Sequence, residues 1–414
     1  MEEAKNPSVV VVSSRLDIGG TERHLARVLP ELRKHGIDVS LFVLERGGSL
    51  EQQLANEGVP VAGPDRRHSR FLNAVSAGWQ FRKYFHRMRP DLVHFFLAEP
   101  YLVGSIATWG VNTTRIMSRR SLALYQRKHP MLALLERSLH RQTSALLGNS
   151  TAVVEDLIRE SGERDRVALI HNGIDLPPRT TPAEQAAMRA QLGIPIDGFV
   201  LVIVANLIPY KGHADLFAAL GQIKERLPQP WRLMIVGRDQ GIGSRLRSDA
   251  ADRGISGNLL WLDERVDAEL LLSAADVSVL ASHEEGFSNS LLEAMGRGIP
   301  VVATTVGGNL DAIVQGQSGF LVPMGTPAAL AEAILDLADN RALRIRIGEG
   351  GRERVKTLFS LDACVRRYVN LYRGAARLHR EPAQSVVDSL AAPGLEQETT
   401  TPGVPTWSMN AKSL

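Results

Sequence analysis

Two glutamates, Glu285 and Glu293, stand eight positions apart, the first in a polar loop and the second inside a predicted helix. A loop that opens into a helix suits an anion, because the first backbone N–H groups of the helix, here those of residues 287–290, have no intrahelical partner and carry the positive end of its dipole. A diphosphate is such an anion. Carboxylates beside it accept hydrogen bonds from hydroxyl groups, which sugars and ribose offer. The spacing therefore indicates a nucleotide-sugar site.

The elements around these acids are predicted to place them at one edge of a sheet. The stretch 275–323 reads as strand, loop, helix, strand and Gly-rich turn, with its turn at Gly307-Gly308. This order is the unit of a parallel sheet, in which ligands bind outside the carboxyl ends of the strands. Glu285 and the glycine pair are both expected at that edge.

Each acid also has an interpretation that involves no ligand. Ser290-Leu291-Leu292-Glu293 fits a capping box, in which Glu293 satisfies only the start of its helix. Glu285 stands beside Glu284 in a loop and fits a solvated surface charge equally well. The residue pattern alone leaves both alternatives open.

Further motifs accompany the two acids along most of residues 8–378. They are Gly19-Gly20-Thr21-Glu22, Asn172-Gly173-Ile174-Asp175, Lys211-Gly212-His213, Val236-Gly237, the run from Ala294 to Val302, Gly307-Gly308-Asn309 and the run from Ser318 to Pro323. Together they resemble the retaining GT-B glycosyltransferases of glycosyltransferase family 4. The resemblance implies an α/β protein with two Rossmann-like, doubly wound domains that face each other across a cleft. It also implies a hexosyltransferase that moves a sugar from a nucleotide sugar to an acceptor, with retained anomeric configuration and no metal or other cofactor.

The resemblance assigns roles to individual residues. Lys211 and the helix start are expected to neutralise the leaving diphosphate, which is where electrostatic stabilisation helps a reaction most. Glu285 is expected to orient the sugar and support the breaking glycosidic bond, so Glu285 and Lys211 are the predicted catalytic pair. Glu293 is expected to hold the ribose. The predicted donor-binding residues are Gly20, Asn206, Lys211, Gly237, Arg238, Glu285, Gly286, Phe287, Ser288, Asn289 and Glu293.

The chain departs from the family pattern on the donor diphosphate. The family commonly places Arg and Lys five residues apart there, whereas this chain has Asn206 before Lys211. One formal charge is missing. Arg238 and Arg265, which each follow a predicted strand, are the candidates to replace it.

A second departure concerns the acceptor side. Family members often carry a His near the sugar, after the strand that corresponds to residues 115–117, but this chain has Ser118-Arg119-Arg120 there. Arg119 and Arg120 are therefore expected to contact an anionic acceptor or phosphate. The resemblance implies that the Gly19-Gly20 turn faces the donor phosphates and the acceptor, and a plain tight turn is its alternative.

Length and composition favour a two-domain globular protein. The chain has 414 residues, of which 44% are hydrophobic and 22% charged. A single cysteine, Cys364, excludes an internal disulfide and suits a reducing compartment. Residues 1–7 lack a signal pattern, and uncharged stretches such as 100–114 fall short of the roughly 20 apolar residues of a membrane span. The expected location is the cytoplasm, with peripheral association at the inner face of the cell membrane.

Net charge is only +3, but residues 66–141 hold 14 Lys or Arg against three acids. Aromatic residues are interleaved there, at Phe71, Trp79, Phe81, Tyr84 and Phe85. Such a segment suits an anionic membrane surface or a phosphorylated acceptor, and an ordinary solvated face is the alternative. Nucleic acid is not an expected partner, because no recognised nucleic-acid motif accompanies the charge.

Alternating strand and helix signals divide the chain. Residues 1–176 are predicted to form the acceptor-side domain and 177–360 the nucleotide-sugar domain, whose first helix starts with a capping box at Thr181–Glu184. Residues 361–378 are predicted to be a helix that crosses back to the first domain. The tail, 379–414, is predicted to be disordered.

Other chemistries fit the sequence poorly. Gly237, Gly241 and Gly243 follow a strand, but their G-x-x-x-G-x-G spacing is not that of a dinucleotide fingerprint. No H-E-x-x-H or D-x-D is present to hold a metal. Two rivals remain, which are a nucleotide-sugar epimerase or hydrolase on the same fold and a membrane-associated donor-binding subunit without catalysis.

Overall fold

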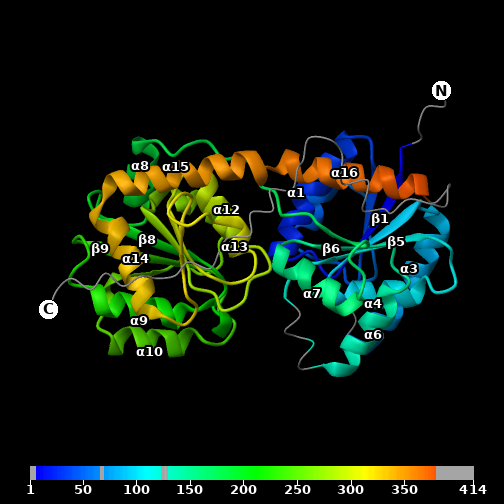
Figure 1. The fold of residues 1–414 in the computed structure, drawn as a ribbon, viewed down its shortest axis with the longest axis horizontal. Helices are drawn as coiled ribbons and strands as arrows, with labels where there is room; N and C mark the ends of the chain where they lie inside the picture. Colours follow the sequence, from blue (N-terminus) through cyan, green and yellow to red (C-terminus); the bar gives the residue numbers. More distant parts are fainter. Residues whose placement is uncertain (1–5, 66–69, 123–125, 127–128, 379–414) are drawn as a thin grey trace.

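The computed structural model describes residues 6–65, 70–122, 126 and 129–378, which form two α/β domains (Figure 1). The predicted tail, 379–414, lies outside the described residues. Each domain is built on one sheet whose pairings are all parallel. The expected fold class, two doubly wound Rossmann-like domains, is confirmed.

The N-terminal sheet has the strand order β3-β2-β1-β4-β5-β6-β7. Its strands are β1 Ser8–Ser13, β2 Asp38–Val43, β3 Val61–Ala62, β4 Leu92–Phe96, β5 Thr114–Arg119, β6 Ala145–Gly148 and β7 Val167–Leu169. Its helices are α1 Gly20–Lys34, α2 Glu51–Asn56, α3 Arg70–Met88, α4 Ala98–Ala107, α6 Pro130–His140 and α7 Thr151–Ser161. The strand order reverses between β1 and β4, which makes the carboxyl ends of these strands a switch point where ligands bind.

The second sheet has the order β10-β9-β8-β11-β12-β13 and its own reversal between β8 and β11. Its strands are β8 Phe199–Val204, β9 Trp231–Val236, β10 Leu259–Trp261, β11 Val277–Leu280, β12 Val301–Thr304 and β13 Phe320–Val322. The helices are α8 Pro182–Gln191, α9 His213–Ile223, α10 Gly243–Asp252, α11 Ala268–Leu271, α12 Asn289–Gly296, α13 Asn309–Ala312, α14 Pro327–Asp339, α15 Arg341–Leu358 and α16 Leu361–Leu378, with short 3₁₀ turns η1 Pro209–Lys211, η2 Ser256–Asn258 and η3 Leu272–Ala274.

Both faces of each sheet are apolar, as expected for parallel strands covered by helices on two sides. Successive side chains of β1 alternate, so Val9 and Val11 join the core under α1 and α16, whereas Val10 and Val12 join the core under α3, α4, α6 and α7. The strand, helix and strand expected within residues 275–323 are found as β11, α12 and β12, and the predicted capping box from Thr181 to Glu184 starts α8. The strands β3 and β13 were not expected from the sequence.

The last described helix, α16, lies against α1 of the N-terminal domain, although it follows the second domain along the chain (Figure 1). Val365, Tyr368 and Tyr372 are buried in the N-terminal core. The Tyr372 hydroxyl lies 2.7 Å from Nδ1 of buried His94, and Nε2 of the same ring lies 2.8 Å from the Ser118 hydroxyl. The His94 ring thus joins α16 to Ser118, near the carboxyl end of β5, by hydrogen bonds at both of its nitrogens.

Among the described residues, no helix combines the length and the apolar character that a membrane crossing requires.

Acidification is predicted to destabilise the α16 contact. Burial, reinforced by the charge of Arg120, lowers the pKa of His94 well below its usual value, whereas an unfolded imidazole titrates near about 6.5. Below that pH the unfolded chain binds a proton that the folded chain does not, so stability falls as the pH decreases, by up to about 1.4 kcal/mol per pH unit for this group. Urea unfolding at about pH 7.5 and about pH 5.5 measures the change.

Two variants assign this pH dependence. His94→Asn should lower the free energy of unfolding at both pH values and flatten its pH dependence. His35→Gln, which removes an exposed imidazole just after α1, should keep the wild-type slope. The same slope in His94→Asn as in the wild type would show that another group is responsible.

Candidate functional site

A cleft of about 500 Å³ lies between the two domains, where both switch points face each other. Its wall from the N-terminal domain includes Gly19, Gly20, Glu22, Arg23, Arg120 and Asn149, and its wall from the second domain includes Asn206, Tyr210, Lys211, Gly237, Arg265, Glu285, Gly286, Phe287, Ser288, Asn289 and Glu293. Most of the predicted donor-binding residues therefore line a single cleft, as the topology requires of loops at the carboxyl ends of strands.

Glycine backbones allow the loops around this cleft to pack closely. Gly212 has a φ of +69° and lies against Ala281, so that a Cβ atom there would come within 1.8 Å of the Ala281 carbonyl oxygen. Gly307 has a φ of +46°, and a Cβ on it would come within 1.7 Å of the Glu285 carbonyl oxygen. Any other residue at either position would push the loops carrying Lys211 and Glu285 out of place.

Lys211 and Glu285, the predicted catalytic pair, contact each other in the cleft. Nζ of Lys211 lies 2.6 Å from Oε1 of Glu285, and the Ser282 hydroxyl donates to the same oxygen over 2.8 Å. Glu285 is buried, so this carboxylate is held in a defined orientation by two donors. The interpretation of Glu285 as a solvated surface charge is therefore wrong.

The N-terminus of α12 opens into the cleft between the two glutamates. Its N-cap is Ser288, whose hydroxyl accepts from the backbone N–H of Leu291 over 3.3 Å. The capping-box alternative, with Ser290 as the cap and Glu293 as its partner, is therefore wrong. Across the cleft, Nδ2 of Asn289 donates to the carbonyl oxygen of Gly20 over 3.0 Å, so the starts of α12 and α1 face each other. Two helix N-termini converge on this part of the cleft, which favours an anion there.

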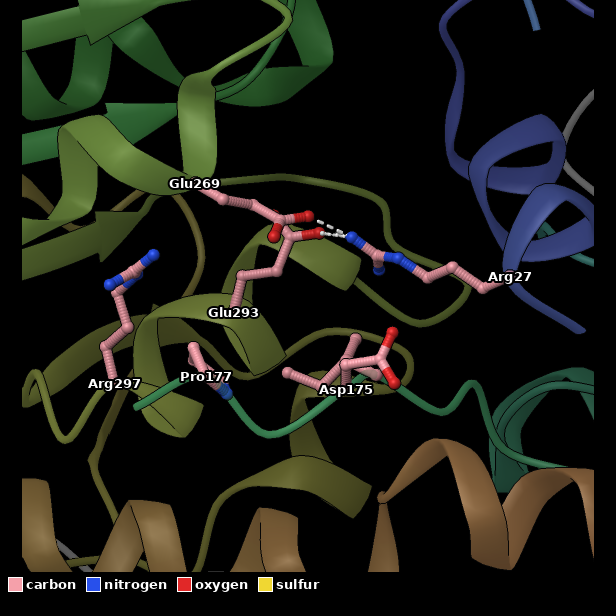
Figure 2. Close-up of a pocket in the computed structure, with 7 residues that line it drawn as sticks. Arg27, Asp175, Pro177, Glu269, Glu293 and Arg297 are labelled. Carbon is pink, nitrogen blue, oxygen red and sulfur yellow. Dashed lines mark hydrogen bonds and ion pairs between the residues drawn. The ribbon is translucent and has the colours of Figure 1, made fainter. Parts of the chain in front are cut away.

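Glu293 faces both the cleft and a small pocket of about 30 Å³ beside it. Figure 2 shows this pocket, where Arg27 of α1 reaches Glu293 and Glu269 of the second domain. Nη2 of Arg27 lies 2.9 Å from Oε1 of Glu293. Burial raises the pKa of Glu293 to about 7, against the opposing effect of the Arg27 charge. Glu293, the residue predicted to bind the ribose, is therefore held by a cation from the other domain.

A chain of hydrogen bonds also joins the domains through Asn172. Oδ1 of Asn172 accepts from Arg120 over 2.5 Å, and its Nδ2 donates to the carbonyl oxygen of Phe287 over 3.1 Å and to Oδ1 of Asn289 over 2.6 Å. Arg120 is buried, which lowers the pKa of its guanidinium from the ordinary value. This cation of the N-terminal wall is thus fixed to the loop that starts α12.

Two of the predicted site residues lie elsewhere. Arg119 donates to Glu160 over 2.6 Å and to Glu136 over 3.1 Å on the opposite face of the N-terminal sheet, because neighbouring strand residues alternate in direction. Its assignment to the acceptor side is wrong. Arg238 does not line the cleft; its side chain lies 3.7 Å from Glu264, and only its backbone N–H contacts Asn206.

Arg265 is the candidate cation that does line the cleft. Its Nε and Nη2 each donate to a carboxylate oxygen of Asp267 over 2.7 Å. Its charge is therefore already compensated within its own loop. Lys211, paired with Glu285, and Arg120, bound to Asn172, line the same cleft, and Arg23 of α1 is a further cation of its lining.

Several residues that the structure brings into the site have no role predicted from the sequence. Glu22 lines the cleft from the first turn of α1, and burial raises its pKa. Asn172 belongs to the motif Asn172-Gly173-Ile174-Asp175, which by itself predicts no contact for this side chain. Arg27 is separated from Glu293 by 266 positions and belongs to no motif that was recognised. The contact between Arg27 and Glu293 depends on how the two domains meet, and a single sequence carries no signal for that.

Among the described residues, no group of three or more His, Cys, Asp or Glu side chains is arranged to hold a metal ion. The expectation that catalysis needs no metal stays a prediction.

Two family models match the chain, "Glycosyltransferase Family 4" over residues 18–177 and "Glycosyl transferases group 1" over residues 184–354. The D-inositol 3-phosphate glycosyltransferase of Streptomyces avermitilis is 27% identical over 406 residues, which span 89% of this chain and 86% of that protein. The protein of the same name from Corynebacterium urealyticum is 29% identical over 407 residues, which span 89% and 94%.

A solved structure of Anabaena HepE, in complex with UDP and glucose, is similar with a TM-score of 0.79 and 21% identity, over 88% of this chain and 98% of that chain. WaaG, a glycosyltransferase involved in lipopolysaccharide biosynthesis, has a TM-score of 0.72 at 18% identity, over 88% and 99%. These likenesses show the fold. With the two family models and the matching site, the chain belongs to glycosyltransferase family 4 and is a GT-B enzyme that moves a sugar from a nucleotide-sugar donor to an acceptor.

Proposed function

We propose that the enzyme is a retaining hexosyltransferase that uses a uridine-diphosphate sugar and acts in polysaccharide or glycolipid assembly. The observation that carries the proposal is the Lys211–Glu285 pair beside the N-terminus of α12. Solved relatives of this fold contain UDP or UDP-glucose, which favours uracil as the base. Glu293 holds the ribose, and the sugar lies beside Glu285.

In this proposal the donor's C1–oxygen bond breaks while Lys211 and the α12 N–H groups neutralise the leaving diphosphate. The acceptor hydroxyl forms the new bond to C1 on the same face, and its proton passes to the departing phosphate oxygen. Glu285 supports the positive charge that develops on the sugar ring. No metal takes part, since a lysine and helix dipoles supply the positive charge.

The acceptor is proposed to be a small sugar, polyol or lipid-linked molecule that carries a negative charge. Arg120 is the buried cation of the N-terminal wall and stands where family members often have a histidine. The curated relatives are named for an inositol phosphate acceptor, which is an acceptor of this class. The proposed location is the cytoplasm, at the inner face of the cell membrane.

Glu285→Gln should lower turnover by about a hundredfold while UDP binding persists, because the lost charge matters most as the glycosidic bond breaks. Turnover is measured as the release of UDP from UDP-glucose, with and without an inositol phosphate or other acceptor. Glu284→Gln, the neighbouring acid, is the matched control. Unchanged turnover in Glu285→Gln would contradict the proposed role.

The same assay separates the rivals. Turnover that needs no acceptor would favour a hydrolase or epimerase, and donor binding without turnover would favour a non-catalytic subunit. EDTA should leave the rate unchanged. Loss of activity with EDTA, restored by Mg²⁺, would overturn metal independence.

Lys211→Ala should raise the Kd for UDP and slow departure of the diphosphate together. Charge-assisted bonds to phosphate are roughly twice as strong as neutral ones, and the usual arginine partner is Asn206 here. Asn206→Arg should restore part of the loss in a double-mutant cycle.

Arg238→Ala and Arg265→Ala are the matched controls for Lys211, because Arg238 does not line the cleft and Arg265 is bound by Asp267 of its own loop, whereas the partner of Lys211 is the proposed catalytic Glu285. They are expected to have small effects on UDP binding. A nearly silent Lys211→Ala combined with a severe effect of either arginine change would place the diphosphate elsewhere.

We further propose that the outer surface of α3, α4 and α6 binds anionic membranes. These helices pack against one another on the side of the N-terminal sheet away from α16 (Figure 1). Their exposed apolar residues, with one from the segment just after α4, are Leu72, Val75, Trp79, Met88, Ile106, Trp109, Met131, Leu134 and Leu135. Exposed cations stand among them at Arg82, Lys83, Arg87, Arg89, Arg137 and Arg141.

This surface differs from the one expected from the sequence. Phe81, Tyr84 and Phe85 are buried in the core because they lie on the inner side of α3. Trp79 is exposed, with Nζ of Lys83 lying 3.4 Å from its ring centroid. The side chain of Phe71 lies outside the described residues.

The full chain is predicted to sediment with anionic phosphatidylglycerol liposomes at low salt and to be released by high salt, since surface charge is screened within about 10 Å at 0.1 M. Trp79→Ser with Met131→Ser should weaken binding, because both side chains are exposed and apolar. Equal binding to neutral phosphatidylcholine liposomes would contradict the electrostatic part of the proposal. Absence of binding to either would contradict all of it.

A further inference from the structure

Arg27 is a charged residue of the N-terminal domain that acts, in this structure, on the donor side of the cleft. It lines the small pocket beside the cleft but not the cleft itself. Its Nη2 contacts a carboxylate oxygen of Glu293 and one of Glu269, on α12 and α11 of the second domain (Figure 2). Arg27 is thus placed behind Glu293, seen from the cleft.

The contact leaves Glu293 one oxygen for a ligand. Arg27 occupies Oε1, and among the residues that the structure describes, no other donor is hydrogen-bonded to this carboxylate. A carboxylate oriented by one cation and open on its second oxygen can accept hydrogen bonds from a pair of neighbouring hydroxyls. Ribose presents such a pair.

The charges around Glu293 compete over its ionisation. Arg27 and Arg23 of α1 favour the carboxylate, whereas Glu269 of α11 and burial disfavour it. Arg297, the residue just after α12, and Asp175, from the segment after Asn172, complete the charged lining of the pocket. In the part of the chain that the structure describes, Arg27 is the one donor to the side-chain carboxylate of Glu293, so its removal leaves a buried acid facing a second acid.

We propose that Arg27 is a positioning residue for the donor, which holds Glu293 oriented and ionised for the ribose hydroxyls and so makes nucleotide binding depend on contact between the two domains. The inference rests on the proposed function, in which Glu293 holds the ribose. Arg27 touches neither donor nor acceptor. Because nucleotide binding and the Arg27 contact share this one carboxylate, each strengthens the other to the same extent.

The test uses calorimetric titration of the full chain with UDP and with 2′,3′-dideoxy-UDP, which lacks both ribose hydroxyls. Arg27→Met should weaken UDP binding by about tenfold near neutral pH, and it should leave dideoxy-UDP binding nearly unchanged. Arg33→Met is the matched control, because Arg33 lies on the same helix and contacts Asp38 instead. A structural role alone would weaken both nucleotides equally, and that result would overturn the proposal.

A pH series provides a second readout. Without Arg27 the pKa of Glu293 rises further, so the deficit in UDP affinity should shrink as the pH increases above about 7 and the acid of the variant ionises again. Arg27→Lys, which restores a positive charge, should recover most of the affinity. A deficit that does not change with pH would contradict the proposal.

Glu269→Gln gives a result of the opposite sign, which a misfolded variant could not produce. Removing this acid frees Arg27 for Glu293 and lowers the pKa of Glu293, so UDP should bind more tightly at low pH than in the wild type. Weaker binding at low pH would contradict the proposal.

Glu293→Gln separates this inference from the function on which it rests. If it weakens UDP but not dideoxy-UDP, the ribose assignment stands, and a silent Arg27→Met then overturns only the positioning role. If Glu293→Gln affects neither nucleotide, the proposed donor placement itself is wrong.

Discussion

The close packing of backbones around Glu285 and Gly286 is the constraint on which the rest of the site depends. Gly307 and Gly308 press against the carbonyl groups of Glu285 and Gly286, and a Cβ on Gly286 would come within 2.2 Å of the carbonyl oxygen of Arg120 in the other domain. Glycine is therefore required on two of these three segments, at Gly286 and at Gly307-Gly308, for them to pack this closely at the start of α12. The side chains of the site are thus positioned by a backbone that accepts no larger residue at these three glycines.

Charges in the cleft and in the small pocket beside it are arranged as pairs whose two members come from different loops or different domains. Lys211 and Glu285 come from two different loops of one domain, whereas Arg27 and Glu293 come from different domains. A buried ion is costly unless it is paired and hydrogen-bonded. Each pair therefore forms only when two loops, or the two domains, lie close together. The geometry of the site depends on these contacts as much as on the individual residues.

Local patterns in the sequence were sufficient for the fold and for much of the cleft. Alternating apolar strands and helices, together with the loop motifs at Lys211 and Glu285, predicted two parallel sheets and a donor wall because each signal is contained within a few residues. Arg119 was misplaced because its direction depends on the phase of β5, which the sequence does not display. Arg27 was missed because its partner lies on another domain, and contacts between domains leave no local pattern.

The position of α16 bears on the order in which the chain becomes stable during synthesis. Residues from Leu361 to Ala375 complete a core whose other members come from the first 170 residues. A ribosome makes the amino-terminal part first, so this domain emerges before α16 has been made, with α1 and one apolar face of its sheet uncovered. The second domain, in contrast, takes most of its core from its own residues. Truncation before α16 would consequently leave the amino-terminal domain, and not the neighbouring one, as the part exposed to aggregation and proteolysis.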